Sequence, residues 1–167
     1  LYENLIPLVT DSIKKDDNKN FRNLLKCSAY FFDMSMKSII IYNSDAEINL
    51  EPVKKKLKGF FKELNDVISK VPEENDELNS GTVFTDQQLI LQHFPAMIIA
   101  LIQCIDPQFL GKTVVSFIRS IRYVKDDKKQ LPLDKSRMKI LYILSGTKCW
   151  ENENSRKILQ GVYKSEL

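Results

Sequence analysis

Glycine, cysteine and histidine are scarce in this chain of 167 residues, and each shortage excludes a class of structure or chemistry. Five glycines are too few for a β-rich fold full of tight turns or for a glycine-rich phosphate loop. The three cysteines, Cys27, Cys104 and Cys149, are far apart and include no C-x-x-C pair, so we expect core thiols of a reduced protein rather than a disulfide framework. The single histidine, His93, excludes every metal motif that needs two.

Long apolar runs and a strong charge of one sign are also missing. The longest apolar run is 96–102, far short of the roughly 18 residues that span a bilayer, and the first residues do not lead us to expect a charged-then-apolar leader. We therefore expect a cytoplasmic protein that neither spans nor inserts into a membrane. Because the sequence starts at Leu1, inside an apolar-periodic stretch, we interpret residues 1–167 as one domain excised from a longer chain.

The charge balance argues against a dedicated nucleic-acid binder. The chain carries 25 Lys and Arg against 22 Asp and Glu, for a net charge of +3. Residues 1–83 have a net charge of −2 and residues 84–167 one of +5, so the two ends can face different partners. Acidic residues interrupt the basic run from Arg119 to Lys139. We therefore interpret that run as a solvated face rather than a groove for nucleic acid or lipid headgroups.

What the chain does have is helical periodicity, which is clearest after Pro52. Proline suits the first turn of a helix, where its missing N–H would have no partner. The apolar residues that follow occupy one face of the predicted helix, while lysines fall outside it. They are Val53, Leu57, Phe60, Phe61, Leu64, Val67, Ile68 and Val71.

The remaining segments also predict helices. A Thr85 to Gln88 capping-box pattern predicts the start of a long helix that Pro95 kinks, and Asp106-Pro107 predicts an N-cap followed by a first-turn proline. The acidic stretch 72–81 is expected to be an exposed loop and a solvated surface rather than a metal site, and 125–133 to be a charged link. The predicted helices span about 1–14, 20–42, 52–71, 85–105, 107–121, 134–145 and 152–167.

These patterns predict an all-α fold of about seven helices. Long helices joined by polar turns favour irregular antiparallel hairpins stacked as an armadillo-like or HEAT-like α-solenoid, although a closed helical bundle is the alternative. The hairpins start near residues 20, 85 and 133, so no strict repeat is present. Excision of such a stack should leave apolar patches on its first and last helices.

We find no residues that make a catalytic, cofactor or metal site. His93 and Cys104 are about 16 Å apart along one helix at 1.5 Å per residue, too far for a dyad. The fragment Gly111-Lys112-Thr113 imitates the end of a Walker loop but lacks the leading glycine and the strand, so we treat it as chance. Trp150 is interpreted as a packing anchor in a loop. No enzyme activity and no cofactor are expected.

The chain resembles the armadillo-like helical region of DOCK-family guanine nucleotide exchange factors, nearest the Rac-directed, ELMO-associated branch. The resemblance extends over residues 20–145 and is expected to continue to the C-terminus. It depends on the order of three features: an aromatic-rich helix with a Lys37-Ser38 step, a Phe-x-x-Leu-Asn helix at Phe61 to Asn65, and a proline-containing helix followed by the Asp-Pro-x-x-Leu turn at Asp106 to Leu110.

The resemblance implies a non-catalytic scaffold between the lipid-binding and exchange domains of the parent protein, with a protein-interaction surface. Its implied partners are the neighbouring domains and an ELMO-type adaptor, with a Rho or Rac GTPase bound only through the separate exchange domain. The parent would be recruited to the plasma membrane. An alternative function is a HEAT-like adaptor domain of an unrelated trafficking or transport assembly.

Overall fold

The computed structural model describes residues 18–42, 49–70, 77–121 and 127–166, together with Pro7 and Asp11. Within these residues every regular element is a helix and there is no strand, so the all-α prediction is confirmed. The helices are α2 (Asn18–Tyr42), α3 (Glu51–Ile68), α4 (Glu77–Leu101), α5 (Pro107–Ser120), α6 (Asp127–Ser145), α7 (Lys148–Glu151) and α8 (Glu153–Glu166). Apart from Pro7 and Asp11, the helix predicted near residues 1–14 lies outside the described residues.

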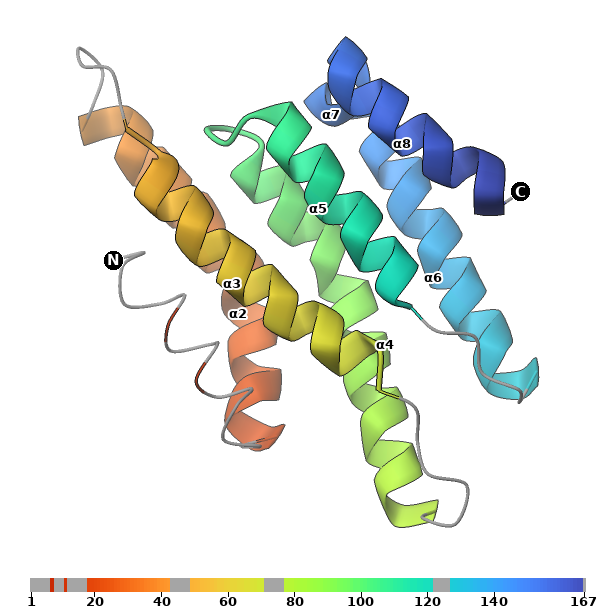
Figure 1. Cartoon of the computed structure of the whole chain (residues 1–167). Coiled ribbons are helices and arrows are strands. Elements are labelled where there is room, and N and C mark those ends of the chain that lie inside the picture. Colours follow the sequence, from red (N-terminus) through yellow and green to blue (C-terminus); the bar gives the residue numbers. More distant parts are fainter. Residues whose placement is uncertain are drawn as a thin grey trace.

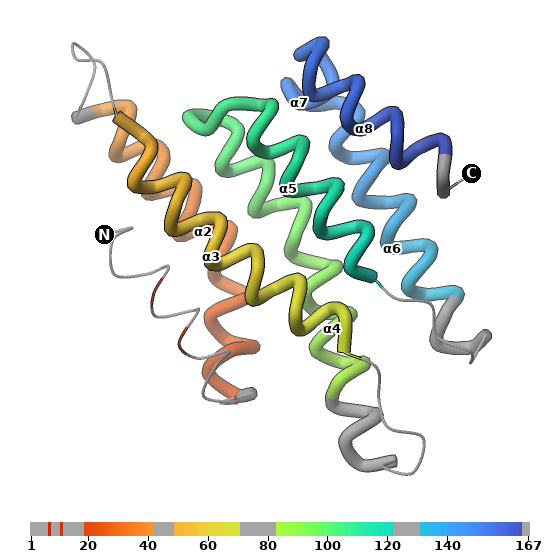
Figure 2. Tube along the Cα trace, in the orientation of Figure 1, coloured from red at the N-terminus to blue at the C-terminus, as the bar shows by residue number. Residues whose placement is uncertain are grey.

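The helices form two layers. Helices α3, α5 and α8 lie in front of α2, α4 and α6 (Figure 1), and successive long helices run in opposite directions (Figure 2). Within the front layer α5 packs between α3 and α8, and in the layer behind α4 packs between α2 and α6. The chain is thus a stack of antiparallel helical hairpins, as predicted. Its assignment to the armadillo or HEAT solenoids stays a prediction.

Helix α3 follows the sequence pattern closely. Pro52 occupies its first turn, and the side chain of Asn49 accepts a hydrogen bond from the backbone N–H of Glu51 at 3.0 Å. The predicted apolar face is buried at all seven of its described positions: Val53, Leu57, Phe60, Phe61, Leu64, Val67 and Ile68. Val71, the eighth, lies outside the described residues. Local amphipathicity is therefore enough to orient this helix.

Helix α4 begins eight residues before the predicted start at Thr85, so the capping-box interpretation and the loop prediction for 77–81 are wrong. Phe84, just before the predicted start, packs against the core, and tertiary contacts hold the residues that follow it. Buried Asp86 pairs with Arg22 of α2 at 2.5 Å, and the side-chain amide of buried Gln87 donates to the backbone carbonyls of Ile68 and Lys70 at 3.0 and 2.8 Å. These contacts fix residues 86 and 87 inside a helix against α2 and α3.

Helix α6 also begins early, at Asp127 rather than at residue 134, so part of the predicted charged link is helical. Pro132 lies inside this helix. Leu133 beside it is buried, and the guanidinium of Arg137 donates to the backbone carbonyl of Ile121 at the end of α5. Packing on α4 and the bond of Arg137 therefore outweigh the helix-breaking tendency of the proline.

Five phenylalanines connect the two layers through the core. Phe32 of α2 makes an edge contact with Phe60 of α3, with ring centroids 5.6 Å apart. Phe60 and Phe61 are 5.1 Å apart, and Phe61 meets Phe94 of α4 at 5.9 Å. Phe94 stacks on Phe117 of α5 at 3.7 Å with the planes 7° apart. The aromatic contacts thus run without a break through α2, α3, α4 and α5.

The three cysteines occupy three different environments, and all are free thiols. Cys149 is buried and Cys104 is half-buried, and burial raises the pKa of both thiols, which keeps them protonated and unreactive. Cys27 is exposed, so its prediction as a core thiol is wrong. The buried positions of α2 include Leu25 and Ser28 on either side of it, and Cys27 faces outward between them.

Trp150 is a packing anchor, as predicted, but it lies in α7 rather than in a loop. Its ring makes an edge contact with Tyr163 of α8, with centroids 5.1 Å apart. The Tyr163 hydroxyl donates to the backbone carbonyl of Leu141 in α6. These contacts tie α7 and α8 to the layer behind them.

Large apolar residues are exposed on only one layer of the described structure. All eight lie on α2, α4 and α6, and none on the described side chains of α3, α5 or α8: Tyr30, Met34, Ile40, Ile41, Ile99, Leu131, Met138 and Tyr142. The apolar patch predicted for the last helix is therefore absent from its described part, and that predicted for the first helix lies outside the described residues. No helix in the described part of the chain combines the length and apolarity that a membrane span requires.

Candidate functional site: a lysine-lined groove between α3 and α5

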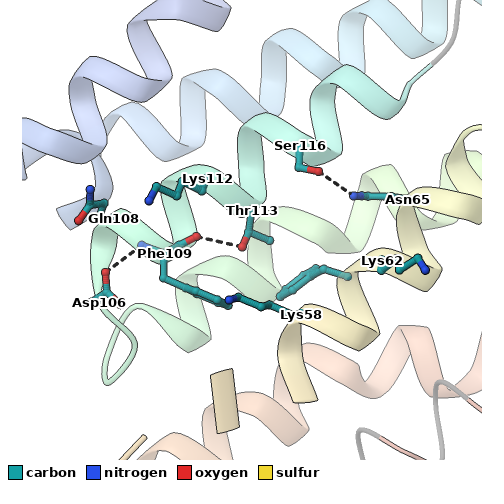
Figure 3. Close-up of a pocket in the computed structure, with 10 residues that line it drawn as sticks. Lys58, Lys62, Asn65, Asp106, Gln108, Phe109, Lys112, Thr113 and Ser116 are labelled. Carbon is teal, nitrogen blue, oxygen red and sulfur yellow. Dashed lines mark hydrogen bonds between the residues drawn. The ribbon is translucent and has the colours of Figure 1, made fainter. Parts of the chain in front are cut away.

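A groove of about 480 Å³ lies between α3 and α5 (Figure 3). Lys58 and Lys62 line it from α3, and Lys112 lines it from α5. All three are exposed, while buried Phe61 and half-buried Phe109 give the groove an apolar floor. Lys58 and Lys62 are four residues apart, so they lie on the same outward face of α3, opposite its buried stripe.

Two polar contacts hold the groove's walls. The side-chain amide of Asn65 on α3 donates to the Ser116 hydroxyl on α5 at 3.1 Å, which ties the helices together at one end of the groove (Figure 3). The Thr113 hydroxyl donates to the carbonyl of Phe109 one turn earlier at 3.0 Å. The spacing between the two walls is therefore set by a direct bond from α3 to α5.

Asp106 closes the groove's other end and caps α5. Its carboxylate accepts the backbone N–H of Phe109 at 2.8 Å, and Pro107 follows in the first turn, so the predicted N-cap is confirmed. The Lys54 ammonium lies 3.1 Å from the Asp106 carboxylate and 3.0 Å from that of Glu51. Partial burial by itself would raise the pKa of Asp106, but the Phe109 N–H and Lys54 together outweigh it and lower the pKa below 3.8.

This lowered pKa gives a pH-dependent stability. A carboxyl that is more acidic when folded stabilises the chain above its ordinary pKa of 3.8, and this contribution is lost as the pH falls through the folded-state pKa. Asp106→Asn cannot ionise, so it should be less stable than the wild type at neutral pH, with a gap that shrinks on acidification to about pH 3. Urea denaturation along this pH series measures the gap. A gap independent of pH would contradict the assignment.

Lys58, Lys62 and Lys112 form no ion pair with an acidic residue in the described part of the chain. The ion pairs within the described residues involve other cations, namely Arg22, Lys37, Lys54, Arg137 and Lys157. The Lys58 ammonium is 5.9 Å from the centre of the Phe109 ring, within cation–π range. The groove therefore combines positive charge, an aromatic floor and neutral hydrogen-bonding groups, which suits noncovalent binding of an anionic ligand.

Several residues quoted in the sequence line this groove: Phe61, Asn65, Asp106, Lys112 and Thr113. Lys112 and Thr113 come from the Walker-like fragment. Both belong to a continuous helix. The Gly111-Lys112-Thr113 fragment therefore does not form a loop that could bind a phosphate. His93 is half-buried on α4 and lines a different groove between α2 and α4. Burial and the nearby Lys26 lower the pKa of His93, which favours its neutral form.

The predicted charged surfaces are divided in the structure. Arg119 is exposed on α5, whereas Lys135 and Lys139 are exposed on α6 in the other layer, so the run from Arg119 to Lys139 is not one helix face. The side chains of the acidic stretch 72–81 lie outside the described residues. Within the described part of the chain, no three His, Cys, Asp or Glu residues lie close enough to hold a metal ion.

The sequence alone did not reveal the groove because its two walls are distant in the sequence, with Asn65 and Ser116 separated by 51 positions. The spacing of Lys58 and Lys62 was a visible signal of a cationic face on α3. The pairing of that face with Lys112 depends on the packing of α3 on α5, which no local pattern specifies.

Comparison with known proteins finds no matching family model, and no curated protein or solved structure matches the chain.

Proposed function

We propose that the chain is a non-catalytic helical scaffold segment of a DOCK-type Rho or Rac guanine nucleotide exchange factor. In this role it spaces the lipid-binding and exchange domains of the parent protein and offers them, or an ELMO-type adaptor, an interaction surface. Its site of action would be cytoplasmic, with recruitment of the parent to the plasma membrane. The order of the sequence motifs carries the DOCK part of the proposal.

The observation that carries the scaffold role is the contrast between the two layers. Exposed apolar residues gather on α2, α4 and α6, and contiguous apolar surface marks interaction sites. The outward positions along the centre of α4 have no charge: Gln88, Gln92, Ala96 and Ile99. Depletion of charge is typical of the core of a protein interface. A continuous aromatic core joins α2 to α5 beneath this surface, which supports a rigid spacer.

Two grooves flank this uncharged stripe. One of about 450 Å³ lies between α2 and α4, and one of about 420 Å³ lies between α4 and α6. Ala96 and Ile99 line both. A partner seated there would contact all three helices of this layer, which suits a neighbouring domain better than a small ligand.

Reading the coding sequence of the parent protein tests the DOCK part directly. We expect an exchange domain to be encoded after Leu167 and a lipid-binding domain before Leu1. If the parent has neither, the chain is better explained as a HEAT-like adaptor of a trafficking or transport assembly, since the stacked hairpins support that role equally.

A further inference from the structure

The α3–α5 groove presents positive charge on both of its walls. Lys58 and Lys62 stand one helical turn apart on α3, and Lys112 stands on α5 across the groove (Figure 3). Helix α5 has no acidic residue from Pro107 to Ser120. The one carboxylate at the groove, that of Asp106, already holds the Phe109 N–H and Lys54. The positive charge is therefore available to a negatively charged ligand.

The aromatic floor of the groove indicates a second property of the ligand, an apolar group. Phe61 and Phe109 line it, and the Lys58 ammonium lies beside the Phe109 ring. An inorganic anion would pair with the lysines but leave the aromatic surface exposed to solvent. A ligand that also places an apolar group on this surface gains from its burial. Charge and floor together favour a ligand that is both acidic and apolar.

The spacing of the lysines indicates the form of that ligand. Four residues of helix separate Lys58 from Lys62 by about 6 Å along the axis. Alternate side chains of an extended peptide are about 6.5–7 Å apart on one face, and the residue between them points the other way. Two acidic residues in that arrangement can reach Lys58 and Lys62 on the α3 wall. The apolar residue between them then points across the groove toward Phe109 of α5. Gln108 and Ser116 also line the groove and offer hydrogen bonds to a peptide backbone.

We propose that the α3–α5 groove binds an extended acidic peptide in which an apolar residue separates two acidic ones. The site deepens the interaction role proposed above by naming the chemistry of a partner. It does not depend on the DOCK resemblance, because it follows from the lysines and the floor alone. The outcome of reading the parent's coding sequence and the outcome of a binding measurement are therefore independent.

Fluorescence anisotropy with a labelled Glu-Phe-Glu peptide in a glycine-serine context measures the binding. We expect saturable binding that weakens with added salt. Charge reversal by Lys58→Glu or Lys112→Glu should weaken it about tenfold or more. Lys55→Glu is the matched control, because Lys55 is exposed on the same helix but does not line the groove. Equal losses in all three variants would show attraction to the general surface and overturn the proposal.

Two further arms test the floor and the source of the negative charge. A Glu-Ala-Glu peptide should bind more weakly than Glu-Phe-Glu, and Phe109→Ala should remove that difference. Inorganic phosphate and vesicles containing a phosphoinositide should compete poorly. Equal binding of the two peptides, or vesicle binding that exceeds peptide binding, would overturn the proposal. Circular dichroism melts identify any variant that fails to fold. If Phe109→Ala does not fold, the exposed substitution Lys112→Glu still tests the proposal.

Discussion

Replacing Phe94 by Ala is expected to lower the free energy of unfolding by about 3–5 kcal/mol. Phe94 is fully buried and makes ring contacts with both Phe61 and Phe117. Truncation removes the apolar transfer free energy of the ring and leaves a cavity where α3, α4 and α5 meet. Because the stability of a whole domain is commonly only 5–15 kcal/mol, this is the largest single-residue effect that we expect.

Urea denaturation followed by circular dichroism measures the loss. Tyr142→Ala is the control, because Tyr142 is 79% exposed on α6 and its truncation should change stability by no more than about 0.5 kcal/mol. If Phe94→Ala does not fold, Phe94→Leu should show a smaller loss of the same sign. Similar stabilities for the Phe94 and Tyr142 variants would contradict the proposed core.

Substituting alanine at two glycines should change stability in opposite directions. A Cβ at Gly111 would lie 2.5 Å from the Ser155 hydroxyl oxygen, so Gly111→Ala must displace Ser155 at the contact of α5 with α8 and should cost about 1–3 kcal/mol. A Cβ at Gly59 of α3 meets nothing within 4 Å. Gly59→Ala should therefore stabilise the chain by about 0.5–1 kcal/mol, the difference in helix propensity.

Thermal or urea denaturation of both variants checks this pair, since the chemical change is the same at each position. The double variant Gly111→Ala/Ser155→Gly should recover part of the loss, because it removes the side chain that the new methyl group meets. If Gly111→Ala proved as stabilising as Gly59→Ala, α5 and α8 could not approach each other as closely as the structure shows.

The sequence predicted the features that depend on neighbouring residues. The buried face of α3 follows from periodicity, and the cap at Asp106 follows from a carboxylate that precedes a proline. The helical state of Ile39 to Tyr42 was also predicted correctly, although β-branched residues favour strands.

Features that depend on partners distant in sequence were not predictable in this way. Gln87 of α4 bonds to carbonyls at the end of α3, and Arg137 of α6 bonds to the carbonyl of Ile121 after α5. Neither pairing can be inferred from neighbouring residues. The exposure of Cys27 depends on which face of α2 meets α4. The groove needs the packing of α3 against α5, so its two walls were visible only as separate lysines.

Gly111 illustrates how a local motif can mislead. In the sequence it opens a Gly-Lys-Thr fragment like the end of a phosphate-binding loop. In the structure it is a buried helical residue at the contact of α5 with α8. Its lack of a side chain serves helix packing, which accounts for the glycine without any nucleotide.

Nucleotide release from a Rac-type GTPase most directly tests whether the chain is a non-catalytic scaffold. The purified chain should leave the release of a fluorescent guanine nucleotide at its spontaneous rate, whereas the parent protein, extended through its predicted exchange domain, should accelerate it. Acceleration by the chain alone, comparable to that of the extended protein, would contradict its assignment as a scaffold.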